Sequence, residues 1–387
     1  MKNMEAMAVV FFWMIGAIPF LYVLARAVLP LDLRLRWKLV LTALLFLVAF
    51  KFQILRRFAG PMFFAPDLPN WILALAAWAF TSLVFFFAFL LAADVVRLLS
   101  WAVWRMLRRS PIPRIREANA WLNLGLLVLS CVLTSWGMGN AAKLPEVRRV
   151  ELADAALPCE TENLKVALLA DLHIDRMTSR DDIAEVVRRT NALDPDVIAI
   201  AGDFVDGTVE ELRDKVAPLA GLRAKYGVFG IPGNHEYYSG YRAWMEHLAG
   251  LGMVMLENSH RLLPHKIALA GVTDPTARRF DEEMPDFDKA LRGIPEDHYR
   301  ILLAHQVKQT NEVAKRGVNV QLSGHTHGGM VVGLDRLVAR SNGGYVADKY
   351  QVSGMTLYVS RGTYLWKGYP VRLGVPSEIT LVTLRRR

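Results

Sequence analysis

The stretch "LKVALLADLHID", residues 164–175, changes character half-way along. Its first seven residues, 164–170, are apolar apart from one lysine, as in a short strand buried in a sheet. Asp171 and His173 follow at once. In open α/β sheets, ligands bind just beyond the carboxyl ends of the strands. The stretch therefore predicts a buried strand that delivers an aspartate and a histidine to a functional site.

Four further stretches repeat this arrangement downstream. In each, an apolar run ends where polar residues begin: "DVIAIAG" (196–202) before Asp203, "YGVFGIPG" (226–233) before Asn234 and His235, "YRILLAH" (299–305) ending in His305, and "NVQLSG" (319–324) before His325 and His327. Because all five polar groups follow strands of one domain in one order, we expect them to converge on a single site.

The remaining pattern of this domain indicates a layered architecture. Further strands are predicted at 266–272, 356–360 and 378–384, and helices at 180–192, 208–222, 241–250 and 308–316. Strands that alternate with helices favour βαβ units, but the later strands have less helix between them. We therefore expect an α/β (α+β) layered sandwich of two β-sheets flanked by helices, over residues 164–387, after a linker at 144–163.

The side chains at the strand ends are suited to divalent metal ions. They are carboxylate, amide and imidazole groups without a thiolate, which favours Mn, Fe, Co, Ni or Zn over a structural thiolate zinc site. The candidates are Asp171, His173, Asp203, Asn234, His235, His305, His325 and His327. Up to eight groups suffice for two ions that share a bridging carboxylate. Two ions about 4 Å apart clamp the oxygens of a phosphoryl group and activate a hydroxide.

Each piece taken alone has an ordinary explanation. Asp203 and Asp206 could be a helix cap and a loop turn, and "NHE" after Pro-Gly could be a simple turn. A single histidine at a strand end is more often hydrogen-bonded than a metal ligand. The joint pattern of five strand ends favours the metal site over these separate explanations.

At this point the chain resembles a known family. "ADLHID", "AGDFVDG", "PGNHEYY", "LLAHQ" and "SGHTHGG" are similar to the five motifs of the calcineurin-like metallophosphoesterase superfamily, in that family's order, over roughly Leu164 to Leu384. The tail "YVSRGTYLWKGYPVRLGVPSEITLVTL" resembles the end of its membrane-anchored branch. Two positions depart from the family's pattern: Val307 stands where proline is frequent, and Met330 where glutamine is frequent. Neither position supplies a ligand.

The resemblance implies a role for each candidate. Asp171, His173 and His327 would hold one metal ion, Asn234, His305 and His325 the second, and Asp203 would bridge the two. His235 would face the substrate and act as the catalytic residue, stabilising the phosphoryl transition state or protonating the leaving oxygen. Asp206 and Glu236 would orient the ligands, although ordinary loop hydrogen bonding explains them equally well.

Residues 1–143 are of another kind, with long runs rich in Phe, Trp and Leu. Four stretches are long and apolar enough to span a membrane, at about 6–29, 37–55, 71–96 and 120–140. The first is longer than the core of a signal peptide, so we interpret it as an anchor. The sequence therefore predicts an all-α transmembrane bundle of four helices ahead of the sheet domain.

Basic residues suggest the orientation of these spans. Residues 1–143 carry a net charge of +10 and the remainder −1, so the excess belongs to loops beside the membrane and a nucleic-acid partner is not expected. The loops after the first and third spans hold ten basic residues, against seven on the other side. The ten are Arg26, Arg34, Arg36, Lys38, Arg97, Arg105, Arg108, Arg109, Arg114 and Arg116. This bias predicts a multi-pass protein of the cell membrane whose catalytic domain is extracytoplasmic.

Together these features predict a membrane-anchored phosphoesterase with two divalent metal ions. It would hydrolyse a phosphodiester or pyrophosphate bond by a metal-activated hydroxide, in a lipid-linked or envelope substrate. Aromatic residues near the motifs would pack on an acyl chain or simply line the core: Tyr237, Tyr238, Tyr241, Trp244, Tyr364, Trp366 and Tyr369. Three alternatives stay open, namely a phosphomonoesterase or nucleotidase acting on soluble substrates, a non-catalytic metal-binding membrane sensor and, more weakly, a transporter.

Overall fold

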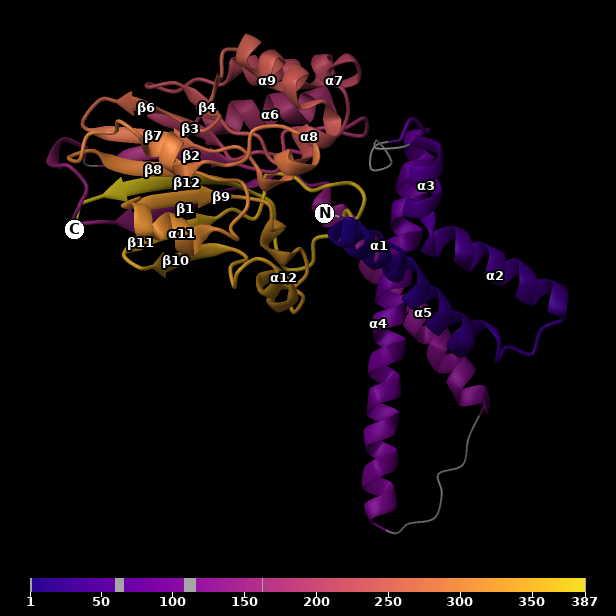
Figure 1. Ribbon diagram of the computed structural model, residues 1–387. Helices are drawn as coiled ribbons and strands as arrows, with labels where there is room; N and C mark the ends of the chain where they lie inside the picture. The colour runs from indigo at the N-terminus through magenta and orange to yellow at the C-terminus, as the bar shows by residue number, and fades with distance from the viewer. Residues whose placement is uncertain (1, 60–65, 108–115, 162, 387) are drawn as a thin grey trace. The chain divides into compact units, whose positions relative to one another are not determined.

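The computed structural model describes residues 2–59, 66–107, 116–161 and 163–386 (Figure 1). It divides into two compact units, Met1–Met138 and Gly139–Arg387. We call them the helical unit and the sheet unit. The division falls inside the last helix of the helical region, three residues before its end.

The sheet unit contains two six-stranded sheets (Figure 1). Their orders are β1-β12-β2-β3-β4-β5 and β10-β11-β9-β8-β7-β6. The strands are β1 (Glu146–Ala153), β2 (Leu164–Leu169), β3 (Val197–Ile200), β4 (Val228–Gly230), β5 (Val254–Met255), β6 (Ser259–Leu263), β7 (Ile267–Gly271), β8 (Tyr299–Leu303), β9 (Val320–Ser323), β10 (Asp348–Val352), β11 (Met355–Val359) and β12 (Glu378–Arg385). Both sheets are mixed: β2, β3, β4 and β5 run parallel, whereas β12 is antiparallel to β2. The predicted two-sheet sandwich is confirmed.

All eight predicted strands form, and four strands were not predicted. Among the latter, β1 lies within residues 144–163, which the sequence suggested as a linker. It pairs in parallel with β12 along its whole length and forms one edge of the first sheet. Its alternation of apolar with charged residues leaves one face exposed, so it lacks the apolar run by which the buried strands were found.

Helices cover the outer faces of both sheets. Those of the sheet unit are α6 (Arg180–Asn191), α7 (Val209–Val216), α8 (Asn234–Ser239), α9 (Tyr241–Gly250), α10 (Phe287–Leu291), α11 (Thr310–Val313) and α12 (Asp335–Ser341), with short helices at Cys159–Thr161, Ala217–Gly221, Pro275–Arg279, Ala314–Arg316 and His327–Gly329. Buried side chains of both sheets, such as Leu168 and Tyr358, form one apolar core between them. A second core lies under α6, α7 and α9, and a third under α10 and α11.

Local sequence explains how these helices begin and which face they bury. In α6, the Ser179 hydroxyl accepts a hydrogen bond of 3.0 Å from the Asp182 amide, which caps the first turn. Ile183, Val186 and Val187 follow at the spacing of one helical face, and all three are buried. The capped, amphipathic helix therefore packs against the first sheet and supports the loops at its strand ends.

The helical unit contains α1 (Lys2–Val23), a π-helical turn (Leu24–Val28), α2 (Leu35–Ala49), α3 (Lys51–Ala59), α4 (Asn70–Met106) and α5 (Arg116–Ala141). Within the described residues, two helices are long and apolar enough to cross a membrane: α4, and Asn119–Ala141 of α5. The predicted spans 71–96 and 120–140 therefore coincide with helices that are able to cross a membrane. The described apolar part of the first span, Trp13–Val28, is shorter than that test requires.

The predicted span 37–55 is not one straight helix. It divides into α2 and α3, which bend by 67° at Phe50, so the pair passes the test for a membrane span only when taken together. Among the described residues, two helices are thus able to span a membrane, or three with the bent pair, where four were expected. The Lys51 ammonium follows the bend and lies 4.8 Å from the Phe80 ring centroid of α4.

A polar cluster joins the first, third and fourth predicted spans. The Arg26 guanidinium donates two hydrogen bonds of 2.6 Å to the Asp94 carboxylate, and the Tyr22 hydroxyl adds one of 2.7 Å. Arg97 bonds both Asp94, at 2.8 Å, and Asn119 Oδ1, at 2.9 Å. Residues Arg108, Arg109 and Arg114 of the predicted basic loops lie outside the described residues.

Candidate metal centre

The strand-end loops have an unusual backbone. Asp171, His173, Asp203, His325 and His327 have φ values of 54°, 42°, 54°, 72° and 50°. Residues other than glycine seldom adopt this left-handed region, and each such residue costs free energy of order 1 kcal/mol. Strain of this kind gathers at functional sites, where surrounding contacts hold it in place. Five of the eight predicted candidates therefore share a backbone feature that the sequence did not reveal.

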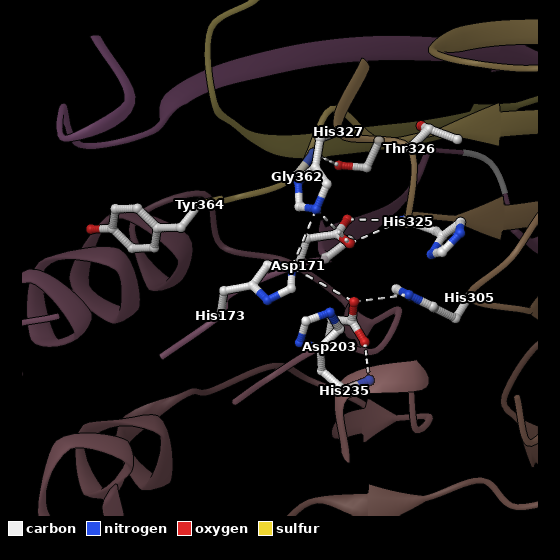
Figure 2. A network of polar contacts seen from close by, with 12 residues as sticks. Asp171, His173, Asp203, His235, His305, His325, Thr326, His327, Gly362 and Tyr364 are labelled. Atoms are coloured by element: carbon white, nitrogen blue, oxygen red, sulfur yellow. Dashed lines mark hydrogen bonds and ion pairs between the residues drawn. The ribbon is translucent and has the colours of Figure 1, made fainter. Parts of the chain in front are cut away.

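The first group of potential ligands consists of Asp171, His173 and His327, one atom of each lying within 4.8 Å of the others (Figure 2). Nε2 of His173 is 3.2 Å from Nε2 of His327, and the latter is 3.7 Å from Asp171 Oδ1. Asp171 follows β2 and is fully buried. Its carboxylate accepts hydrogen bonds of 3.0 and 3.1 Å from the His325 amide, which fixes its orientation.

The second group consists of Asp203, His305 and His325, again within 4.8 Å (Figure 2). Asp203 Oδ2 lies 3.2 Å from His305 Nε2 and 3.6 Å from His173 Nε2, so this carboxylate faces both groups. The other ring nitrogen of His305 bonds the Ala201 carbonyl at 2.7 Å. That bond leaves Nε2 directed at Asp203, as a metal-binding imidazole requires.

Asn234 begins α8 next to these groups. Its side-chain Oδ1 is buried, and among the described residues it has no hydrogen-bond partner. Gly233 precedes it, and a Cβ there would lie 2.2 Å from Asp203 Oδ1, so only glycine permits the approach. A buried acceptor without a donor is costly, and a cation would satisfy it. The donor set of oxygens and imidazoles therefore fits two divalent ions.

His235 stands at the rim of the cluster. One atom of its ring lies within 4.8 Å of ligand atoms of His173 and Asp203, which makes a third overlapping group. Its Nδ1 is 2.5 Å from Asp206 Oδ1, and the same carboxylate lies 3.1 Å from His173 Nδ1 through Oδ2. Asp206 is buried and thus orients a candidate ligand and the candidate catalytic histidine at once.

Glu236 is fully buried, and its carboxylate accepts hydrogen bonds from backbone amides. Its carboxylate accepts hydrogen bonds from the amides of Gly233 at 2.6 Å, Asp203 at 3.1 Å and Phe204 at 2.7 Å. It holds the loop after β3 against the loop after β4. Asp206 therefore contacts two candidate side chains, whereas Glu236 acts through hydrogen bonds to the backbone of the loops that carry Asp203 and Asn234.

Electrostatics prepares the imidazoles for metal binding. Burial, reinforced by the neighbouring His305, lowers the pKa of His325 to about 3. Burial and His173 likewise hold the pKa of His327 well below its usual range. Both rings are neutral at physiological pH, the form that binds a metal. At His305, burial opposes the charged form, but the Asp203 charge outweighs it and raises the pKa. A positive charge is stabilised at that position.

His235 behaves differently from the two neutral rings. Burial opposes its charged form, but the charges of Asp206 and Asp203 outweigh burial and raise the pKa of His235 to about 9. Bound cations would oppose this rise. The ring can hold a proton near neutral pH, which is the state needed to donate to a phosphate oxygen.

One participant was missed by sequence reasoning. Arg372 is almost completely buried, and its guanidinium donates to the carbonyl oxygens of Tyr364 at 2.7 Å, Arg361 at 2.8 Å and His327 at 3.4 Å. It closes the loop after β11 over Asp171, where a Cβ on Gly362 would meet His327 Nδ1 at 3.0 Å. Arg372 lies in the quoted tail, but nothing in its local sequence distinguishes it from a surface arginine.

The predicted aromatic rim divides into two sets. Trp244 is fully buried and donates from Nε1 to the Gly207 carbonyl, and Tyr237 stacks on Tyr241 at 4.2 Å between ring centroids. These belong to the core. Tyr238 and Trp366 lie beside His235, with ring centroids 5.6 and 6.2 Å from it. Only this second pair adjoins the candidate catalytic residue.

Comparison with known proteins agrees with this geometry. The profile of the family described as calcineurin-like phosphoesterase matches residues 164–329. A bovine (Bos taurus) protein named transmembrane protein with metallophosphoesterase domain is 38% identical over 274 residues, covering 67% of this chain and 61% of the relative. An uncharacterized metallophosphoesterase of Aquifex aeolicus is 31% identical over 245 residues, covering 62% of this chain and 91% of the relative.

The chain belongs to the calcineurin-like metallophosphoesterase family. It spans about three fifths of the length of the bovine relative and of its Danio rerio counterpart. Among solved structures, a putative 5'-nucleotidase from Staphylococcus aureus is similar with a TM-score of 0.37 and 12% identity, covering 52% of this chain and 49% of that one. The aspartate and histidine candidates lie in three overlapping groups of potential ligands, as a dimetal centre requires.

Proposed function

We propose that this metallophosphoesterase hydrolyses a phosphodiester or pyrophosphate bond with two divalent ions, acting on a lipid-linked or envelope compound. Asp171, His173 and His327 would hold one ion, and Asn234, His305 and His325 would hold the other. The observation that carries the proposal is Asp203, whose Oδ2 faces His173 of one group and His305 of the other. Two cations at such a site polarise phosphoryl oxygens and make a bound water acidic.

The chain's own residues supply the remaining chemistry. His235 faces the rim of the site with Asp206 on its Nδ1, so its other nitrogen is directed to the substrate side. There it donates to a phosphoryl oxygen or to the leaving oxygen, a role that contributes about 10²- to 10⁴-fold to a rate. Tyr238 and Trp366 flank this ring and restrict its movement.

The membrane placement of the proposal is supported by the polar cluster of the helical unit. Arg26 at the end of the first helix meets Asp94, which lies 24 residues after the start of α4, or about 36 Å along a helix at 1.5 Å per residue. The start of α4 therefore lies about one bilayer thickness away from Arg26. The chain between Arg26 and Asn70 has to cover this distance, and α2 and α3 are the helices in that stretch. We therefore count the bent pair as one crossing. With the first predicted span, 6–29, as a further crossing, the total is four, and the basic loops then favour an extracytoplasmic sheet unit.

The experiment that tests the function uses full-length protein purified in detergent and treated with chelator. We expect hydrolysis of bis(p-nitrophenyl) phosphate only after Mn²⁺ or another divalent ion is restored, and loss of it in Asn234→Ala and His235→Ala. His298→Gln, which alters a histidine outside the cluster, is the control. Faster turnover of p-nitrophenyl phosphate or a nucleoside monophosphate would favour the phosphomonoesterase alternative. Metal binding without turnover of any ester would favour the sensor.

A further inference from the structure

The strongest exposed apolar feature of the sheet unit lies just after the metal-binding loop. Among the described residues from Gly139 onward, seven large apolar side chains are exposed, and three of them fall within 332–337. They are Val332, Leu334 and Leu337, exposed by 69%, 38% and 61%. Leu334 and Leu337 stand three residues apart at the start of α12, on one face. We call residues 332–337 the apolar turn. Figure 1 shows α12 apart from the helices α6–α9.

The apolar turn is fixed to the candidate ligands at both ends. On the incoming side, a Cβ on Gly329 would lie 2.6 Å from the Asp335 Cα, so α12 packs directly on the residue two positions after His327. On the outgoing side, the Thr326 hydroxyl donates to the Val346 carbonyl at 2.6 Å. A movement of the turn would therefore displace the loop that carries His325 and His327.

The same turn is connected by hydrogen bonds to the first residues of the sheet unit. The Val332 amide donates to the Leu373 carbonyl at 3.0 Å, and the Leu373 amide to the Met330 carbonyl at 3.0 Å. The preceding residue, Arg372, accepts at its carbonyl a hydrogen bond of 3.2 Å from Asn140. Asn140 belongs to the sheet unit and ends the apolar segment Asn119–Ala141. A short series of hydrogen bonds thus connects the turn, through Leu373 and Arg372, to the Asn140 side chain.

Charge indicates what covers the turn. Arg336 and Arg340 are exposed on α12, one helical turn apart, beside the apolar side chains. Apolar residues flanked by arginines suit a bilayer surface with anionic head groups. The other exposed apolar pair within one loop, Phe280 and Met284, brackets the acidic stretch 281–283, which anionic lipids would repel.

We propose that the apolar turn inserts into the head-group layer of the membrane, with Arg336 and Arg340 on anionic lipid phosphates, and holds the metal centre at the lipid surface. The substrate class that this placement serves is a phospholipid-like ester whose phosphate lies at the head-group level. This proposal deepens the proposed function. The substrate class rests on the proposed function, whereas the membrane contact of the apolar turn does not.

The first test measures immersion without turnover. Full-length protein in which Cys131→Ser and Cys159→Ser remove the native thiols is spin-labelled at Leu337→Cys, with Val332→Cys as a second position. Met284→Cys is the matched control, since it is also apolar and exposed. In vesicles containing anionic phospholipid, we expect the labels at 337 and 332 to be relaxed by oxygen and shielded from a water-soluble nickel chelate, and the label at 284 to show the reverse.

Two results would overturn the proposal. One is equal access of the nickel chelate to positions 337 and 284. The other is spin–spin broadening at 337 that disappears on dilution with unlabelled protein, because a second copy of the chain would then cover the turn. Replacing both arginines, Arg336→Gln with Arg340→Gln, should make the label at 337 shallower in anionic vesicles but leave it unchanged in zwitterionic ones.

The second test compares two substrates. Leu337→Asp should slow hydrolysis of a vesicle-embedded diacylglycerol phosphodiester with a p-nitrophenol leaving group about tenfold, a fold-change in keeping with losing the burial of one leucine. Hydrolysis of soluble bis(p-nitrophenyl) phosphate should stay unchanged. Equal slowing of both would contradict the surface role. If neither substrate were hydrolysed by any form, the proposed function would fail, while the spin-label result would still decide the membrane contact.

Discussion

The molecule contains two clusters of charged side chains, and they are built in opposite ways. In the helical unit, the Asp94 carboxylate is surrounded by Arg26, Arg97 and Tyr22, so its charge is matched by the protein itself. In the sheet unit, Asp171 and Asp203 are buried among imidazoles, and burial together with the Asp203 charge raises the pKa of Asp171. The first cluster is complete as it stands and the second calls for cations. A carboxylate paired with arginines therefore indicates a structural role, whereas carboxylates and imidazoles that converge without a cation indicate a metal site.

The largest effect is expected from replacing Asp203, the carboxylate that faces both groups of potential ligands. Asp203→Asn removes the charge that faces both groups, and we expect metal-dependent diester hydrolysis to fall at least about 10³-fold, since metal ions supply several kcal/mol to such reactions. Steady-state kinetics with bis(p-nitrophenyl) phosphate measures this. A loss below tenfold would contradict a bridging role for Asp203.

The next effect concerns His235, which lies at the rim and is not assigned as a ligand. His235→Gln should lower kcat about 10²- to 10⁴-fold. The metal content per chain should stay that of the wild type. If the ring protonates the leaving oxygen, diesters with poor leaving groups will suffer more than those releasing p-nitrophenol. Loss of one metal ion in this variant would instead make His235 a ligand.

A smaller effect is expected from replacing Asp206, whose carboxylate contacts His173 and His235. Asp206→Asn keeps the shape but weakens the hold on His173 and His235, and such changes typically lower metal affinity about 10- to 100-fold. Titration of the metal-free protein with Mn²⁺ measures this, with Asp297→Asn as an exposed control. Unchanged affinity would mean that Asp206 serves structure alone.

The smallest effect is expected in the Asp94 cluster of the helical unit. Asp94→Asn should lower the stability of the helical unit by about 1 kcal/mol, since polar contacts within membranes contribute about that much. It should leave soluble diester hydrolysis unaltered. Thermal unfolding in detergent measures the stability, and the kinetic assay measures the activity. A strong loss of activity would show that the Asp94 cluster and the metal centre are coupled.

The two clusters also differ in how well the sequence predicts them. The metal centre was predictable because each donor follows an apolar strand. The donors follow β2, β3 and β4 of one sheet and β8 and β9 of the other. Arg372 was not, because its role arises from three distant carbonyl groups. The edge strand β1 escaped because half of its residues face solvent. The pairing of Arg26 with Asp94, 68 residues apart, and the bend at Phe50 depend on packing between helices, which local periodicity does not record.

The most direct test of the central claim counts metal ions in the purified full-length protein. Elemental analysis of Mn²⁺-loaded protein should give two ions per chain, and electron paramagnetic resonance should show the exchange-coupled spectrum of ions that share a bridging ligand. Asp203→Asn should abolish the coupling. Full hydrolytic activity in protein that holds one ion, or none, would contradict the account.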